Sequence, residues 1–171
     1  MPTIRPAAAA LVLLCAPPAF AQEARELDAH VHGHAELQVA IDGDALTLAL
    51  EIPGESVVGF EHAAETDEQQ AAIDAAVEAM GDPLTLFTLP DAAGCTVAEA
   101  EAEHHQEGTH SAFEAEYALT CASIGALDGM ETTLFETYPD LEEIDVEYAT
   151  PAGQGSGELE PGEAALSLPT S

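Results

Sequence analysis

The chain has 171 residues, with only 2 Lys and Arg residues against 33 Asp and Glu residues, and a formal net charge of −31 at pH 7. Because almost nothing is available to neutralise phosphate groups, this balance excludes nucleic acid and anionic membrane surfaces as partners and favours cations. A carboxylate-rich surface is also typical of adaptation to salty surroundings, where salt screens its self-repulsion.

The first 21 residues have the features of a secretory signal peptide. A short positively charged segment precedes an apolar run at 7–16, and Ala19-Phe20-Ala21 matches an A-x-A cleavage signal. The run is shorter than the roughly 20 residues that a membrane helix needs, and no long apolar run follows it. We therefore expect a signal peptide at 1–21, a secreted product without membrane insertion, and Arg25 as the only permanent cation of the mature chain.

The rest of the chain is long enough for one domain with its own hydrophobic core. We expect residues 22–33 to form a flexible N-terminal lead that contains histidines. Residues 34–171 are then expected to form a single α+β domain.

Two alternating segments open this domain and predict a β-hairpin. The segments 35–41 and 45–52 each place their apolar residues on one face, and Asp42-Gly43 between them is a type I′ turn signal. A two-residue turn at Asp42-Gly43 would place Val39 opposite Leu46, so the apolar faces of the two strands match.

A helix is predicted over 66–80, where Thr66 can act as the N-cap and Gly81 can end the helix. The order of all predicted elements is ββα-ββα-ββ, which indicates an α+β fold with a largely antiparallel sheet and two amphipathic helices. The later elements are strands over 95–103 and 112–121, a second amphipathic helix over 126–138, a strand over 141–148, a Gly-rich turn at 151–157 and one or two short terminal strands.

The mature chain keeps two cysteines, Cys95 and Cys121. In an oxidising compartment we expect a disulfide between them, because a zinc site would need cysteines in closely spaced pairs. If the two face each other, the hairpin centre is Gly108. Glutamates from 99 to 103 would then share a face with aromatic side chains, so either a bulge near Ala98 shifts the register or the hairpin extends beyond the core.

Three of the seven histidines, His30, His32 and His34, stand at alternate positions before the first predicted strand. Alternate residues of a strand share one face, so these histidines would point the same way as Glu36. The predicted register also places Glu51 opposite His34. Imidazole nitrogen and carboxylate oxygen are zinc ligands, so this pattern predicts a metal site. The alternative is a set of solvated residues at a fraying N-terminus.

Three more histidines lie between the two cysteine strands, and we expect the tip of that hairpin to be a mobile, metal-gathering loop. The seventh, His62, follows an apolar patch; it is either a capping or core residue or a ligand that the loop brings to the N-terminal histidines. The candidate residues of the hairpin tip are Glu103, His104, His105, Glu107 and His110.

Several segments of the chain resemble the ZrgA-like periplasmic zinc-uptake proteins. They are GHAEL at 33–37, GFEHA at 59–63, the paired cysteines and the P-x-L-E-x-I-D-V pattern at 139–146. The resemblance covers nearly the whole mature chain, in order. It implies a zinc-binding accessory of a zinc ABC importer, working with the importer's periplasmic solute-binding subunit.

Members of that family usually carry long tracts rich in His, Asp and Glu, which are short in this chain. The resemblance therefore favours His32, His34 and His62 as a defined site. The full set of candidate metal ligands is His30, His32, His34, His62, His104, His105, His110, Glu36 and Glu51.

We therefore expect a periplasmic protein that captures or buffers Zn²⁺ and hands it to the solute-binding subunit. No serine or cysteine nucleophile motif is present, so we do not expect an enzyme. Two alternatives stay open. One is copper or nickel handling, because histidine sites bind Cu²⁺ more tightly than Zn²⁺. The other is a non-metal interaction domain whose acidic surface reflects salt adaptation.

Overall fold

The structure is a computed structural model that describes residues 32–170. The predicted signal peptide, His30 and most of the predicted N-terminal lead fall outside the described residues. Among the residues that are described, no helix is both long enough and apolar enough to cross a membrane.

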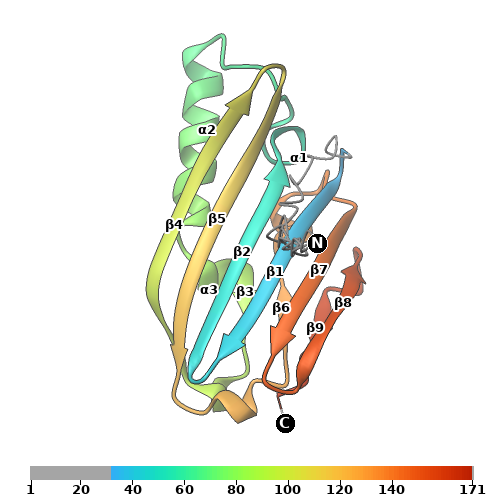
Figure 1. The fold of residues 1–171 in the computed structure, drawn as a ribbon. Helices are drawn as coiled ribbons and strands as arrows, with labels where there is room; N and C mark the ends of the chain where they lie inside the picture. The colour runs from blue at the N-terminus through green and yellow to red at the C-terminus, as the bar shows by residue number, and fades with distance from the viewer. Residues whose placement is uncertain (1–31, 171) are drawn as a thin grey trace, which may run out of the picture.

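A six-stranded sheet with the strand order β4-β5-β2-β1-β7-β8 forms the framework of the fold (Figure 1). Neighbouring strands are antiparallel except for β1 and β7, which are parallel. The strands are β1 (His34–Asp42), β2 (Ala45–Pro53), β4 (Cys95–Glu107), β5 (His110–Cys121), β7 (Glu143–Thr150) and β8 (Gly153–Leu159).

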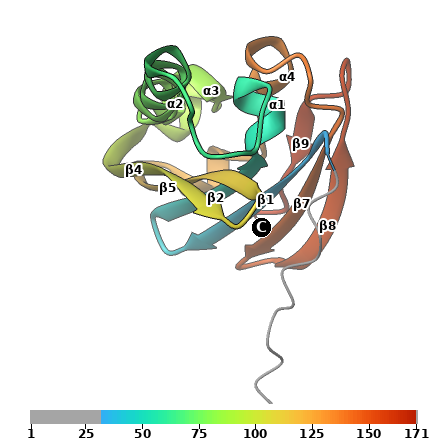
Figure 2. The same cartoon turned by 90° about the horizontal axis from the view of Figure 1, so that it is seen from above.

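Helices gather on one face of this sheet, and a second sheet of order β3-β6-β9 shares the same core (Figure 2). The small strands are β3 (Phe87–Thr88), β6 (Gly129–Thr132) and β9 (Ala165–Ser167). The helices are α1 (Gly54–Val58), α2 (Asp67–Met80), α3 (Pro83–Leu86) and α4 (Leu134–Thr137), with 3₁₀ turns at Asp91–Ala93 and Ile124–Ala126. The predicted α+β class with a mostly antiparallel sheet is confirmed.

Period-two alternation explains why one face of the large sheet is buried. Leu37 and Val39 of β1 are buried in the core, whereas Glu36, which precedes Leu37, is exposed on the opposite face. We call this opposite face the open face, because no helix of the described residues covers it (Figure 2). It carries at least one acidic residue from each of the six strands.

The helix predicted over 66–80 is confirmed almost to the residue as α2. Thr66 is the N-cap of α2, and its hydroxyl oxygen accepts a hydrogen bond from the Gln69 N–H at 3.2 Å. Ile73 and Met80 are buried against the sheet. The Tyr117 hydroxyl of β5 donates a hydrogen bond to the Met80 carbonyl at 2.8 Å, which connects the end of the helix to the sheet.

The predicted register of the first hairpin is wrong by two residues. The two turn residues are Gly43 and Asp44, with Gly43 in the left-handed region at φ 64°, so Val39 faces Leu48 instead of Leu46. An even shift keeps every side chain on its predicted face, because strand side chains alternate with a period of two. The prediction that Glu51 faces His34 fails, since Glu51 pairs with Glu36.

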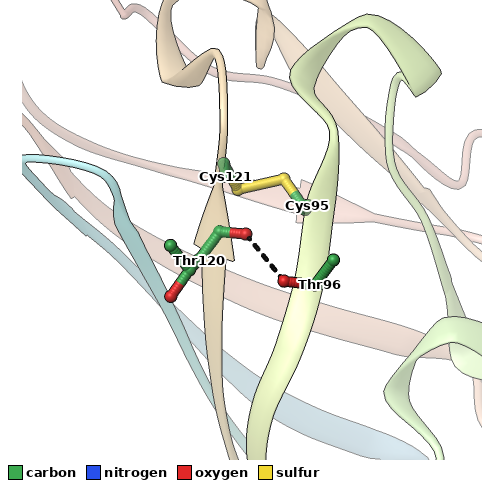
Figure 3. The surroundings of a disulfide bond; sticks show 4 residues. All are labelled: Cys95, Thr96, Thr120 and Cys121. Carbon is green, nitrogen blue, oxygen red and sulfur yellow. Dashed lines mark hydrogen bonds between the residues drawn. A yellow bond between two sulfur atoms is a disulfide. The ribbon is translucent and has the colours of Figure 1, made fainter.

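The predicted disulfide between Cys95 and Cys121 is present, and the two residues are paired across β4 and β5 (Figure 3). Next to it, the Thr96 hydroxyl donates to the Thr120 carbonyl at 3.4 Å. Of the two predicted alternatives, the bulge is correct: the register shifts between Val97 and Glu99. Beyond the bulge β4 and β5 stay paired up to the turn, so the predicted histidine loop is part of a regular hairpin.

The predicted second helix over 126–138 is wrong. This stretch forms the end of a 3₁₀ turn, strand β6 and the short helix α4. A Cβ atom at Gly129 would lie 2.5 Å from the Leu166 carbonyl oxygen, so close pairing with β9 fixes this residue as glycine. The β-branched Thr132 and Thr133 also favour extended backbone over helix.

The predicted Gly-rich turn at 151–157 is mostly strand. Only residues 151–152 form the turn, and the glycines that follow belong to β8. Gly155 pairs with Tyr148, and the tyrosine ring occupies the space where a Cβ at Gly155 would lie. A glycine in this strand therefore marks close packing against a cross-strand aromatic side chain.

Candidate metal centre

Glu61 lies in the loop after α1, where its carboxylate meets two histidines from distant parts of the chain. Its Oε2 atom is 2.9 Å from Nδ1 of His110, at the tip of the β4–β5 hairpin. Its Oε1 atom is 3.5 Å from Nε2 of His32, just before β1. The Gln106 amide donates to the Glu61 carbonyl at 2.9 Å, which fixes this loop against the hairpin tip.

Glu55, in the first turn of α1, adds a second carboxylate to the same place. Its Oε2 atom is 2.7 Å from Nδ1 of His32. One ligand atom from each of His32, Glu55 and Glu61 lies within 4.8 Å of the others. The His32 side chain is 59 % exposed, so this group opens to solvent on one side.

The Glu61 carboxylate is deeply placed for a charged group, because its side chain is only 11 % exposed. Its Oε1 atom is buried and has no hydrogen-bond partner, since His32 at 3.5 Å is too distant for a hydrogen bond. A buried carboxylate oxygen without a partner costs free energy. Residues 32–170 contain no Lys or Arg, so within this described part of the chain the compensating positive charge has to come from the histidines or from a bound cation.

Two further groups of metal-ligand type lie on the open face. In the first, His34 Nδ1 is 3.3 Å from Glu143 Oε1, with Asp145 nearby. In the second, His105 Nε2 is 2.9 Å from Glu103 Oε1 and 3.6 Å from Glu114 Oε2. The hydrogen bond to Glu103 raises the pKa of His105, and the nearby carboxylates add to this effect.

Neighbouring histidines of the hairpin separate onto opposite faces of the sheet, because strand side chains alternate. His104 packs its ring against Phe113 on the core side, with the ring centroids 4.8 Å apart. Burial, and then the neighbouring positive charge of His105, lower the pKa of His104. The predicted cluster at the hairpin tip is therefore divided into separate environments.

His62 has its own local contacts and joins none of the three metal-type groups of the described residues. Its Nδ1 atom lies 2.9 Å from the Ala63 carbonyl, and its ring stacks on Phe60 at 5.1 Å. Glu36 and Glu51 pair with each other across β1 and β2 on the open face, also outside these groups.

Of the three alternating N-terminal histidines, His32 and His34 do not share one strand, and His30 lies outside the described residues. His32 lies in a turn, and Gly33 after it has a left-handed backbone with φ 83°. The strand begins only at His34. The turn directs His32 to Glu55 and Glu61, whereas His34 lies on the open face beside Glu143.

Glu55 and Glu61 were not among the residues expected from the sequence. A signal for Glu61 was available, because it directly precedes His62 within the GFEHA segment. No comparable signal marks Glu55, which reaches the site only because α1 follows β2 without a loop.

Comparison with known proteins places the chain in a family. Residues 29–168 match the family model described as ZrgA family zinc uptake protein. No curated protein matches the chain. The match covers most of the chain, including all three groups of metal-type ligands, and the family is one of zinc uptake. The chain belongs to the ZrgA family of zinc uptake proteins.

Proposed function

We propose that this protein is a periplasmic zinc-binding protein that captures Zn²⁺ at a centre formed by Glu61, His32, Glu55 and His110. It then passes the ion to the solute-binding subunit of a zinc ABC importer. Zn²⁺ is the cargo of this protein, and its membership of a zinc uptake family supports the choice of metal.

The observation that carries the proposal is the position of the Glu61 carboxylate. It is the most buried carboxylate among the ion pairs of the described residues, and it contacts histidines from both histidine-bearing segments. Imidazole nitrogens and carboxylate oxygens are ligands that zinc takes in proteins. A divalent cation here would also provide a partner for the buried Oε1 atom.

The exposure of the outer ligands suits a protein that releases its metal. Side chains of His32 and His110 are 59 % and 62 % exposed, and only Glu61 lies deep. An incoming acceptor can therefore reach the outer ligands first and replace them one at a time. The acidic surface raises the local concentration of cations and speeds their capture.

Calorimetric zinc titration of the metal-free mature protein at neutral pH tests the proposal. We expect the Glu61→Gln variant to bind zinc about 10–100-fold more weakly than wild type, at least the loss seen for supporting residues of metal sites. Glu65→Gln, an exposed carboxylate in the same loop, is the matched control and should bind like wild type. The proposal would be overturned if wild-type protein did not bind zinc, or if Glu61→Gln bound zinc with unchanged affinity.

Transfer is tested separately. Zinc-loaded protein is mixed with the metal-free solute-binding subunit, the two are separated, and zinc is measured in each. We expect most of the zinc to move to the subunit faster than it appears in a dialysis control without direct contact. Equal rates in the two experiments would contradict direct hand-over while leaving zinc binding intact.

A further inference from the structure

The side-chain amide of Gln106 connects the two segments that carry Glu61 and His110. Gln106 lies near the end of β4, and its Nε2 atom is 2.8 Å from the His110 carbonyl oxygen and 2.9 Å from the Glu61 carbonyl oxygen. A third carbonyl oxygen, that of Gly108 in the hairpin turn, lies 3.3 Å away. One amide group therefore bonds to the backbone of both residues.

The three carbonyl oxygens decide which way the Gln106 amide points. The nitrogen and oxygen of an amide have nearly the same shape, so their hydrogen-bond partners distinguish them. All three neighbours here are acceptors, so the nitrogen has to face them, and a carbonyl oxygen in its place would be repelled. The two amide protons match the two shorter bonds, to His110 and Glu61, and the longer contact to Gly108 shares one of them.

The bonds that Gln106 makes leave the ligand atoms of the metal centre free. Its acceptors are backbone carbonyls, whereas zinc would bind a carboxylate oxygen of Glu61 and a ring nitrogen of His110. The direct contact between those two side chains, from Glu61 Oε2 to His110 Nδ1, uses atoms of ligand type. A zinc ion bound through either atom competes with that contact, but it does not compete with Gln106. The Gln106 bonds can therefore be present both with and without metal.

Packing brings the same two segments close together without adding a polar connection. A Cβ atom at Gly54, the first residue of α1, would overlap the Ser111 hydroxyl oxygen and would lie 3.2 Å from the Phe60 carbonyl oxygen. The Ser111 hydroxyl is nevertheless buried without a hydrogen-bond partner. Within residues 32–170, the side-chain hydrogen bonds between the loop and the hairpin tip come from Gln106 and His110.

We propose that Gln106 is a positioning residue of the metal centre, which holds the Glu61 loop and the hairpin tip so that Glu61 and His110 can bind the same zinc ion. This inference rests on the proposed function and concerns how its centre is assembled. The His110 side chain is 62 % exposed, so little packing restrains it. Ligands that are already held in place lose less conformational freedom on binding, so loss of the Gln106 amide weakens zinc binding.

NMR of the metal-free full mature chain tests the positioning without zinc. The substitution Gln106→Met keeps the length of the side chain and removes both donors. We expect it to abolish most of the cross-relaxation between the His110 ring protons and the Glu61 side-chain protons. Gln154→Met, at an exposed position of β8 outside the metal-type groups, is the matched control and should leave that signal unchanged.

Calorimetric zinc titration then tests whether Gln106 acts through His110. We expect Gln106→Met to bind zinc about 10-fold more weakly than wild type, as is typical for residues that support metal ligands. In a His110→Ala background the same substitution should change the zinc affinity by less than about two-fold, because no imidazole is left to position. A general structural defect would instead cause the same loss in both backgrounds.

Gln106→Glu separates positioning from simple attraction of the cation. The substitution keeps the shape of the side chain and adds a negative charge, which by itself would strengthen zinc binding. A carboxylate has no proton to donate and would face three carbonyl oxygens. We therefore expect Gln106→Glu to weaken zinc binding at neutral pH by at least as much as Gln106→Met.

The positioning role would be overturned by an unchanged contact between His110 and Glu61 in Gln106→Met, or by wild-type zinc affinity in that variant. Equal losses with and without the His110 ring, or tighter zinc binding by Gln106→Glu, would also overturn it. Failure of the proposed function is recognised separately, because zinc titration of wild type judges that function and the NMR contact is measured without metal.

Discussion

Glu61 and His110, 49 positions apart in the sequence, are joined by a contact of 2.9 Å between Oε2 and Nδ1. The same carboxylate reaches His32 through its other oxygen. One histidine from before β1, His32, and one from the β4–β5 hairpin, His110, therefore meet at one residue, although they belong to separate clusters in the sequence. A metal ion bound there would connect the start of the sheet to the hairpin tip.

Replacing His110 should weaken zinc binding, whereas replacing His62 should not. We expect His110→Ala to lower the zinc affinity by about 10-fold or more in calorimetric titration, since it removes an imidazole from the Glu61 carboxylate. His62→Ala is the matched control, because the His62 ring contacts Ala63 and Phe60 and joins none of the metal-type groups of the described residues. A larger loss in His62→Ala than in His110→Ala would contradict the position of the centre.

Gly129→Ala distinguishes the observed strand from the helix expected over 126–138. In a helix, alanine in place of glycine would stabilise the protein by about 1 kcal/mol. In the observed strand, the new Cβ meets the Leu166 carbonyl oxygen, so we expect a lower free energy of unfolding, by about 1–3 kcal/mol. Urea denaturation measures the change, and Gly125→Ala, where no atom lies within 4 Å of the added Cβ, serves as the control.

The parts of the fold that the sequence predicted well are those governed by local periodicity. Leu37 and Val39 alternate with polar residues, and that pattern alone assigns their faces. Thr66 marks the start of α2 through its capping side chain. The first hairpin register failed because Asp42-Gly43-Asp44 offers two possible turn positions, and both keep the apolar faces together.

The parts that failed depend on contacts between distant segments. The apolar spacing of Leu127, Met130 and Leu134 fits a helix, and these residues are indeed buried, but pairing with β9 and β3 holds residues 129–132 extended. The site shows the same limit. The histidine pattern predicts a metal site, but it does not identify Glu61 as a partner. The loop that carries Glu61 is held against the hairpin tip by the Gln106 hydrogen bond, a contact that only the tertiary structure creates.

The pKa values of the adjacent histidines His104 and His105 should be shifted in opposite directions from the ordinary histidine value. Burial lowers the pKa of His104, and the hydrogen bond to Glu103 raises the pKa of His105. In metal-free protein we expect NMR to show His105 gaining its proton first as the pH falls and His104 gaining it last. Coincident or reversed midpoints would contradict the assigned environments, and a His104→Gln variant identifies the lower transition.

The two shifts affect stability with opposite sign. The unfolded chain protonates position 104 more readily than the folded chain, so His104 reduces stability as the pH falls below about 6.5. The contribution of His105 is present below that pH and is lost as the pH rises through its raised folded pKa. Accordingly, His104→Gln should make the free energy of unfolding less sensitive to acid between about pH 6.5 and 5.

Removing the disulfide should lower stability without removing the fold. Cys95 and Cys121 are 26 positions apart, and closing a loop of that size stabilises a folded chain by about 3.5 kcal/mol in the chain-entropy description. We expect Cys95→Ser/Cys121→Ser to shift the urea midpoint down by a corresponding amount, and reduction of wild type to reproduce the shift. An unchanged midpoint under both treatments would show that the bond does not constrain the unfolded chain.

Anomalous diffraction at the zinc absorption edge from crystals of the zinc-loaded protein tests the metal centre most directly. We expect the strongest peak at coordination distance, about 2.0–2.2 Å, from a carboxylate oxygen of Glu61 and from a ring nitrogen of His32 or His110. A strongest peak at His62, or at His105 with no density beside Glu61, would contradict the centre proposed for this protein.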